Sequence, residues 1–236
     1  MDNANPPIPR LQRIGFISID QECSYIYNLL ESAIAASVTR INIVELDIST
    51  SPKVGIRPIP FDAFVIASSR PAESAFTLTA NAARRLNATF VPISFPSGHI
   101  CIGPVIVPRN SACWTCWLKR RLQHDNHPQE SEAIRRFYDR SSRSFPPIIQ
   151  PLLHLAACRL ANIFSSNDSL SKWAGHIWHF NPHLFVVQTG TLAGTDGCPH
   201  CGLGRTLEER TYKDLQGWAR STYAPVPPPG RVGKGC

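Results

Sequence analysis

The sequence predicts an α/β protein with a doubly wound sheet, followed by a C-terminal hairpin that a four-cysteine zinc site ties to it. Short apolar runs alternate with segments of helical period over residues 13–108, as in strand-helix-strand units. Two Cys-x-x-Cys turns follow, Cys113-Trp-Thr-Cys116 and Cys198-Pro-His-Cys201. The chain has 236 residues, of which 43% are hydrophobic and 17% charged, which is typical of a globular domain.

The first half predicts a sheet of parallel strands related to the Rossmann type. Apolar runs of strand length are separated by two segments in which apolar residues recur at helical spacing, as at Ile26, Leu30 and Ile34. The predicted strands are Arg13–Ile19, Arg40–Asp47, Phe61–Ala67, Thr89–Ser94 and Ile100–Pro108, and the predicted helices are Glu22–Val38 and Pro71–Leu86. Pro52, Pro58 and Pro60 mark a turn region before the third strand.

The second half predicts a crossover, a long helix and a hairpin. A short helix over Trp117–Gln123 leads into a polar crossover, residues 124–145, with a helical piece around 131–138. Pro146 and Pro147 introduce a helix that runs to about Ser165. The hairpin pairs 176–181 with 184–189 around a turn at Pro182-His183, and it delivers the chain to the second cysteine pair.

The four paired cysteines predict a structural zinc site. A Cys-x-x-Cys turn directs two thiolates at one centre, and two such turns supply the tetrahedral four-sulfur shell of structural zinc. Because sulfur fills every position, no site is left for water or substrate, so a catalytic zinc is not expected. The alternative is four unrelated thiols. The long separation between the pairs implies that zinc joins distant parts of the fold, unlike a compact zinc ribbon.

Several other residues have both a chemical and a structural interpretation. His176, His179 and His183 could form a metal or acid/base cluster, but alternation along a strand turns His176 and His179 apart, which favours ordinary polar strand residues. His200 is an alternative zinc ligand or a shield for the sulfurs. The basic run Lys119-Arg120-Arg121 is a solvated face or a docking patch for an acidic partner, and Trp114 and Trp117 are expected to pack the zinc lobe.

The charge and the termini limit the protein's location and partners. The formal charge of +7 favours acidic partners, although a solvated basic surface explains it as well. The hypothesis that the protein is a zinc-dependent nucleic-acid binder is supported only by that charge and the cysteine turns, and the apolar α/β core disfavours it. No apolar run is long enough to span a membrane, and the N-terminus lacks the pattern of a signal peptide. We therefore expect a cytoplasmic protein of bacterial type, in which reduced cysteines bind metal.

The order of elements and the block IGPVIVPRNSACWTCWLKRR, closed by Cys198-Pro-His-Cys201-Gly202, resemble the ThiF/MoeB-like adenylating family. More narrowly, the chain resembles the ThiF-like partners of YcaO cyclodehydratases, which assist azoline formation in thiazole/oxazole-modified microcins and related bacteriocins. The resemblance covers about residues 13–204. It implies a leader at 1–12, a Rossmann-like half at 13–112, a zinc-clamped half at 113–204 and a charged, proline-rich tail at 205–236.

Two departures from the adenylating enzymes predict a catalytically silent member. The turn after the first strand, Asp20-Gln21-Glu22-Cys23-Ser24, has no glycine and carries two acids where phosphate would bind, so ATP is not expected on this chain. Asp47 stands where a ribose-binding acid would be, but a strand-ending residue is the simpler interpretation. The crossover has no cysteine for a thioester, because Cys158 falls in the long helix.

The resemblance therefore implies a non-catalytic scaffold subunit of a cyclodehydratase complex that modifies a ribosomal precursor peptide. Its partners would be a YcaO-type enzyme and the peptide. A separate chain would capture the leader, because the first strand begins near Arg13 and leaves no room for a winged-helix module. The alternative is an active adenylating enzyme acting on a peptide or sulfur-carrier C-terminus. The oligomeric state stays open, a homodimer included, as does docking of the proline-rich tail.

Overall fold

The computed structural model describes residues 13–35, 42–46, 61–140, 150–165, 170–195 and 197–201. The leader at 1–12, the tail at 205–236 and Asp47 lie outside these residues, so the predictions made for them stay predictions. Everything below concerns the described residues.

One seven-stranded sheet joins both halves of the chain, in the order β2-β1-β3-β4-β5-β6-β7. The strands are β1 (Arg13–Ser18), β2 (Asn42–Leu46), β3 (Ala63–Ser68), β4 (Thr89–Ser94), β5 (Ile100–Ile102), β6 (His176–Asn181) and β7 (Val186–Thr191). The first four strands pair in parallel, and β5, β6 and β7 continue the sheet with antiparallel pairing. The predicted α/β class is confirmed, with a mixed sheet.

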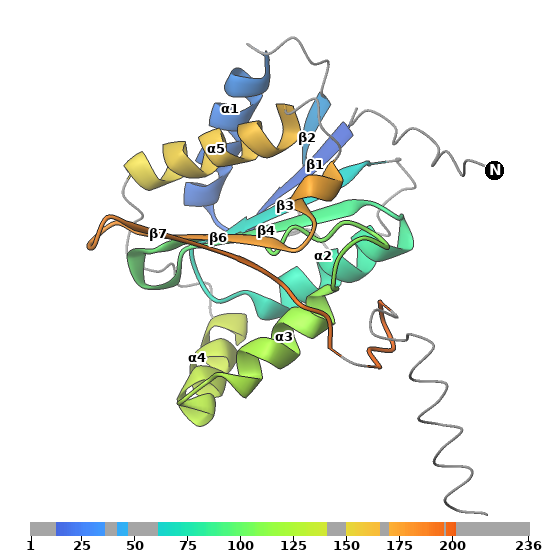
Figure 1. The fold of residues 1–236 in the computed structure, drawn as a ribbon. Helices are drawn as coiled ribbons and strands as arrows, with labels where there is room; N and C mark the ends of the chain where they lie inside the picture. Colours follow the sequence, from blue (N-terminus) through green and yellow to red (C-terminus); the bar gives the residue numbers. More distant parts are fainter. Residues whose placement is uncertain are drawn as a thin grey trace, which may run out of the picture.

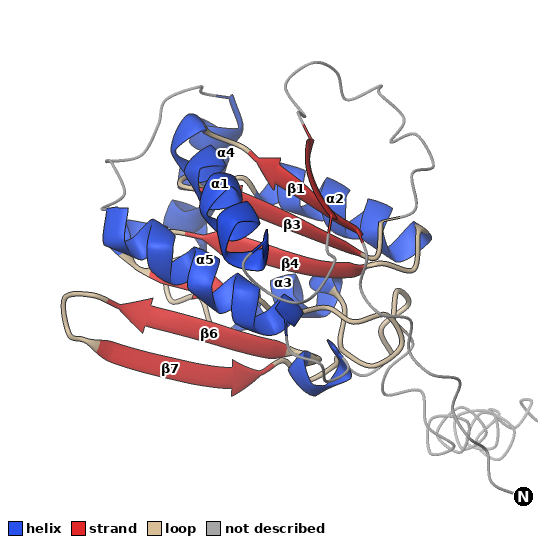
Figure 2. Cartoon of the chain, turned by 90° about the horizontal axis from the view of Figure 1, so that it is seen from above, coloured by secondary structure: helices blue, strands red, loops and turns tan. Residues whose placement is uncertain are grey.

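Helices cover both faces of the sheet (Figures 1 and 2). One face carries α1 (Gln21–Ala35) and α5 (Gln150–Ser165), and the other carries α2 (Glu73–Arg85), α3 (Trp114–Gln123) and α4 (Pro128–Arg140). Two short 3-10 helices complete the described elements, η1 (Pro96–Gly98) and η2 (Leu170–Trp173). The predicted helices are present, with ends shifted by a few residues.

The central strands are apolar on both sides because a helix layer covers each face. All six residues of β3 are buried. Val65 and Ala67 join the core beneath α1 and α5, whereas Phe64 and Ile66 join the core beneath α2. A parallel strand that is buried on both faces has a continuous apolar sequence rather than an alternating one.

Most predicted strands differ from the structure by one or two residues at their ends, and two of these differences have a clear cause. The strand predicted over 100–108 ends at Ile102, because Gly103 adopts φ +99° and a side chain there would collide with the His176 carbonyl. Beyond it only an isolated bridge, Phe90 to Ile106, remains. The hairpin turn spans Pro182–Phe185 rather than Pro182-His183, so β7 begins at Val186.

Candidate metal centre and adjoining cavity

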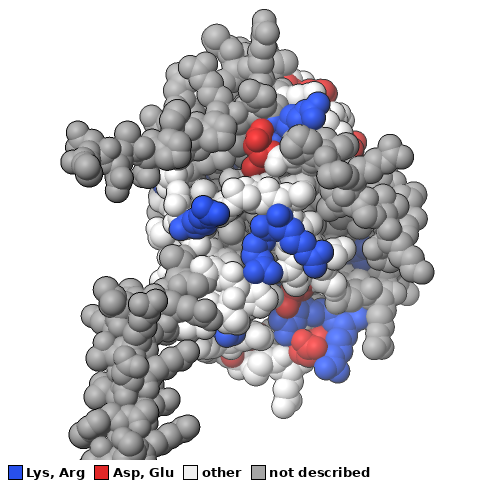
Figure 3. All heavy atoms as spheres, turned by 90° about the vertical axis from the view of Figure 1, so that its right-hand side faces the viewer, with Lys and Arg blue, Asp and Glu red and all other residues white. Residues whose placement is uncertain are grey.

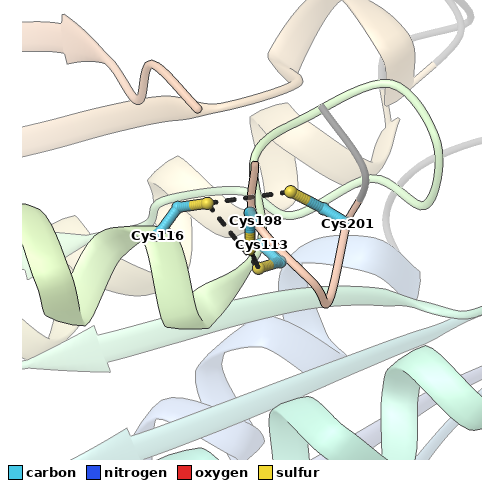
Figure 4. Close-up of side chains that lie close together, drawn as sticks. All are labelled: Cys113, Cys116, Cys198 and Cys201. Carbon is cyan, nitrogen blue, oxygen red and sulfur yellow. Dashed lines mark hydrogen bonds between the residues drawn. The ribbon is translucent and has the colours of Figure 1, made fainter. Parts of the chain in front are cut away.

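The four paired cysteines meet at one point between α3 and the turn that follows β7 (Figure 4). Cys113 immediately precedes α3 and Cys116 lies in its first turn, whereas Cys198 and Cys201 come from the chain after β7. Their Sγ atoms all lie within 4.8 Å of one another. The Sγ–Sγ distances are 3.8 Å for Cys113–Cys116, 3.7 Å for Cys113–Cys198 and 3.7 Å for Cys116–Cys201.

This geometry fits a tetrahedral metal ion. Four thiolates at about 2.3 Å from a zinc ion would have their sulfurs about 3.8 Å apart, close to the three distances above. Cys113, Cys116 and Cys198 are buried together with Ala112 and Leu192, so the cluster is shielded from water. Four sulfurs held this close in a shielded pocket could hold a metal ion, and none of the four forms a disulfide.

Residues around the cluster hold it in place, and sequence reasoning missed them. Thr195 donates from its backbone N–H and its hydroxyl to Cys116 Sγ, at 3.4 and 3.0 Å. Arg120 Nη2 donates to the Gly194 carbonyl at 3.2 Å, and Arg84 Nη1 to the His200 carbonyl at 3.3 Å. Donors that point at a ligating sulfur orient it and stabilise its charge. Thr195 and Arg120 lie close to a cysteine pair in the sequence, whereas Arg84 has no such signal.

The thiols of the cluster differ in proton affinity. Burial raises the pKa of the Cys113 thiol to about 12. Burial acts in the same direction on Cys198, but hydrogen bonds from the backbone N–H groups of Cys201 and His200 and from the neighbouring thiols outweigh it, lowering the Cys198 pKa to about 6. One sulfur of the metal-free cluster is therefore a thiolate at neutral pH while another keeps its proton.

In the turn between β1 and α1, the Asp20 carboxylate lies at the N-terminus of α1. Asp20 Oδ1 accepts from the Cys23 backbone N–H at 3.1 Å, and Asp20 Oδ2 accepts from the Ser69 backbone N–H at 2.7 Å. These N–H groups lie at the helix N-terminus and after β3, where a phosphate would otherwise find donors. The Asp20 carboxylate thus already occupies an anion-binding position. Burial, followed by the charge of Asp20, raises the pKa of the neighbouring Cys23 thiol.

A cavity of about 340 Å³ opens at the carboxyl ends of β3 and β4, between α2, α3 and α4. Apolar side chains form much of its wall, among them Phe76, Phe95, Trp114, Trp117 and Ile134. In open α/β sheets, ligands bind at this end of the strands. The cavity is therefore a second candidate site, separate from the four sulfurs although α3 contributes to both.

Polar groups of the cavity are partly unsatisfied. Arg135 pairs with Glu73 at 3.1 Å and with Glu132 at 2.7 Å, but its Nε atom is buried without a hydrogen-bond partner. Ser69 Oγ is likewise buried without a partner. Buried polar atoms are nearly always hydrogen-bonded, so each of these two atoms requires a partner such as an ordered water or a ligand atom. Cys101 also lines the cavity, and burial raises its thiol pKa to about 11.

The three histidines of the hairpin do not come together as one cluster. His176 makes an edge-to-face contact with Trp173, at 5.7 Å between ring centroids. His179 and His183 both lie against His99, at 5.3 and 6.1 Å between ring centroids. Burial and the neighbouring His99 lower the pKa of His179. No sequence pattern groups His99 with the other two, because only the pairing of β5 with β6 brings them together.

The remaining predicted residues have structural roles or stay on the surface. In the basic run, Arg120 supports the cysteine turn, Arg121 lies 3.8 Å from Glu73 and Lys119 is exposed. Trp117 packs against the buried cysteines, as expected, whereas Trp114 is buried against Phe76 and Phe90 in the core beneath α2. Cys158 is exposed on α5.

The surface charge is dispersed rather than continuous on the face shown in Figure 3. Lys and Arg atoms form separate groups there, and toward the top and bottom of the view acidic atoms lie among them. A nucleic-acid interface would need a continuous basic stripe. Within the described ranges, no helix combines the length and apolar character needed to cross a lipid bilayer.

Solved structures share this fold, whereas no family model and no curated protein matches the chain. The heterocyclase TruD superimposes with a TM-score of 0.58 at 18% identity, over 85% of this chain and 29% of TruD. E. coli MccB superimposes with a TM-score of 0.54 at 16% identity, over 83% of this chain and 59% of MccB. The microcin C7 biosynthetic enzyme MccB in complex with N-formylated MccA superimposes with a TM-score of 0.57 at 15% identity, over 80% of this chain and 67% of that enzyme.

These likenesses confirm the predicted resemblance at the level of the fold. The neighbours are a heterocyclase and a microcin C7 biosynthetic enzyme. The chain spans less than a third of the length of TruD.

Proposed function

We propose that this chain is a non-catalytic, Rossmann-like ThiF-type subunit of a YcaO-dependent complex that forms azolines in a ribosomal precursor peptide. The observation that carries the proposal is the Asp20 carboxylate, which accepts hydrogen bonds from the Cys23 N–H at the start of α1 and the Ser69 N–H after β3, donors that a nucleotide phosphate would need. The fold shared with TruD and MccB supports a role in peptide modification. The ATP-dependent step would belong to the YcaO-type partner.

The four cysteines would bind a structural zinc ion in this subunit. The sulfur spacing fits zinc, and a four-sulfur shell excludes substrate from the metal. Metal analysis of protein purified without chelators should find one zinc per chain. Less than one zinc, or mainly another metal, would contradict this assignment.

The cavity beside Trp117 would receive part of the precursor peptide. Its apolar wall suits side chains of an extended peptide, and the unpartnered Ser69 Oγ and Arg135 Nε suit the peptide backbone or a carboxylate. Ile134 lines the cavity and is 50% exposed, so Ile134→Trp can fill the space without disturbing the core. Phe137→Trp is the matched control, because Phe137 lies on the same helix, is equally exposed and does not line the cavity.

The decisive experiment combines the chain, the YcaO-type enzyme of its pathway, the precursor peptide and ATP. Mass spectrometry should show the loss of one water per azoline, at a rate that falls when this chain is omitted or carries Ile134→Trp but not Phe137→Trp. Full activity of the partner without this chain would overturn the scaffold role. An unchanged rate with Ile134→Trp would overturn only the role of the cavity.

The second candidate function is an active adenylating enzyme for a peptide or sulfur-carrier C-terminus, which the fold shared with the biosynthetic enzyme MccB favours. Calorimetry with ATP, together with peptide-dependent pyrophosphate exchange, distinguishes the scaffold function from the adenylating function. The scaffold proposal expects neither binding nor exchange from this chain alone. We also propose, as parts of the same scheme, a bacterial cytoplasmic location and a separate leader-binding chain.

A further inference from the structure

The β6–β7 hairpin ends in a run of exposed apolar side chains. Four consecutive residues are involved: Leu184 is 69% exposed, Phe185 85%, Val186 42% and Val187 52%. Isolated exposed apolar residues are common on protein surfaces, but a contiguous patch marks an interaction site. The patch lies at the tip of the hairpin, on the opposite side of the fold from α2's C-terminal end (Figure 1).

The patch continues into an open sheet edge. β7 is the terminal strand of the sheet, and all six of its residues are exposed. Its sequence, VVQTGT, contains neither a charged residue nor a proline. Proteins ordinarily protect an edge strand with charges, proline, a bulge or a covering element, because its free backbone groups pair with other chains. The unprotected edge of β7 is suited to accept a further strand.

Phe185 is also held in an unfavourable backbone conformation. Its φ is +51°, in the left-handed region that glycine and asparagine tolerate and bulky residues rarely adopt. A large aromatic residue here adds no buried core contact, since the side chain is 85% exposed. Strain of this kind is commonly found at sites used in binding. The side chain of Phe185 is therefore better explained by a partner than by the fold.

The asymmetry of β7 disfavours a second copy of the chain as the occupant. The apolar residues lie at its start, whereas Thr189, Gly190 and Thr191 form its end. In a two-fold antiparallel pair, the apolar start of each copy would lie against the small, polar end of the other. A different protein, with apolar residues placed beside the hairpin tip, matches this strand better.

We propose that β7 pairs with an edge strand of the YcaO-type partner subunit, and that Phe185 inserts into an apolar pocket beside that strand. The identity of the partner rests on the function proposed above. The backbone of β7 supplies sequence-independent hydrogen bonds, and Phe185 with Leu184 supplies the anchor that selects the partner.

Phe185→Asn separates binding from folding. Asparagine tolerates the left-handed conformation, so the variant should unfold at the same or a higher temperature than the wild type while lacking the anchor. Binding to the YcaO-type partner, measured by calorimetry on the full chain, should weaken by roughly 30-fold or more. Val187→Lys, which places a charge on the open edge, should weaken binding as well. Leu78→Asn is the matched control, because Leu78 is likewise an exposed apolar residue, 53% exposed, but lies on α2 and not on β7, and it should bind like the wild type.

Each outcome decides the proposal. Equal affinity of wild type, Phe185→Asn and Val187→Lys overturns the β7 interface and leaves the proposed function standing. A wild type that does not bind the partner overturns both. If light scattering instead shows a wild-type dimer that Phe185→Asn dissociates, the occupant is a second copy and the proposal is wrong. Hydrogen exchange in the complex should show new protection of β7 amides, and its absence also counts against strand pairing.

Discussion

Cys198 is a fully buried thiol that contacts Cys113 and accepts hydrogen bonds from the backbone of its own turn. The spacing inside each cysteine pair made the ligand set predictable, because a Cys-x-x-Cys turn can direct both sulfurs to one centre. The sequence could not identify Thr195 or Arg120 as supports. Thr195 belongs to no motif, Arg120 belongs only to the basic run after the first cysteine pair, and each reaches its partner through tertiary folding.

Cys198→Ser should remove the metal and destabilise the protein. Structural zinc contributes apparent binding energies of about 10–16 kcal/mol in small peptides, so a loss of several kcal/mol is expected even in a larger domain. That corresponds to a fall in melting temperature of roughly 10 °C or more. Calorimetric melting with metal analysis measures both effects. Cys158→Ser, on the exposed face of α5, is the control and should change neither; a Cys198→Ser variant with full metal content would refute the ligand assignment.

Metal affinity should depend on pH in two stages. The Cys113 thiol, with a pKa of about 12, must lose its proton to bind metal at any physiological pH, so affinity should fall as pH falls. Cys198, with a pKa of about 6, is already a thiolate at neutral pH and adds a second proton competition only below about pH 6. Titration against a competing chelator should therefore show a plot of log affinity against pH that steepens near pH 6. A constant slope through that region would contradict the low pKa of Cys198.

The turn from β1 to α1 is the element that most clearly separates this chain from a nucleotide-binding one. Asp20 stabilises the start of α1 and also fixes the chain after β3, since its two carboxylate oxygens accept from different segments. The acidic, glycine-free sequence predicted that phosphate would be disfavoured there. It did not predict the bond to Ser69, because the contact depends on β1 and β3 being neighbours in the sheet.

Asp20→Ala should destabilise the fold without creating a nucleotide site. Losing a helix cap costs about 1 kcal/mol, and the Ser69 N–H left without its acceptor adds about 1–3 kcal/mol. Urea denaturation should show this loss at unchanged m-value, and Asp20→Asn, which keeps one acceptor oxygen, should lie between Asp20→Ala and the wild type. Tight ATP binding by Asp20→Ala would show instead that Asp20 alone blocks an otherwise intact nucleotide site.

The ends of helices and strands were predictable where the spacing of apolar residues determines them. They were not predictable where tertiary contacts determine them. β4 has the predicted bounds because its apolar run fits one buried strand. The strand predicted over 100–108 continued the apolar run past Gly103, but the close approach of the His176 carbonyl turns the chain away at that residue. The turn of the hairpin was misplaced because Phe185, an apolar residue, takes a turn conformation.

At the scale of the whole molecule, the sheet consists of a deeply buried parallel part and a thinly attached antiparallel part. β3 pairs with β4 over its whole length, whereas β4 joins β5 only through Ile93–Ile102 and Ser94–Cys101. β5 in turn holds β6 over its three residues. The cysteine cluster is a second attachment, since it links the chain after β7 to α3, which packs through Trp114 against Phe90 of β4.

Removing the metal should therefore release the hairpin before it unfolds the parallel strands. Without metal, β6 and β7 keep the short β5 contact, the backbone bonds near Gly175 and the packing of Trp178 and Phe180 against the core, whereas β1, β3 and β4 keep their pairing and their fully buried cores. Hydrogen exchange on chelator-treated protein should show faster exchange in β6, β7 and the cysteine turns, with protection of β1, β3 and β4 largely retained. Exchange that rises equally in every strand would mean that the metal supports the whole domain as one unit. Unchanged exchange in the hairpin would mean that β5 and the packing of β6 against the core hold it without the metal, so the cluster would not act as a clamp between the two parts of the sheet.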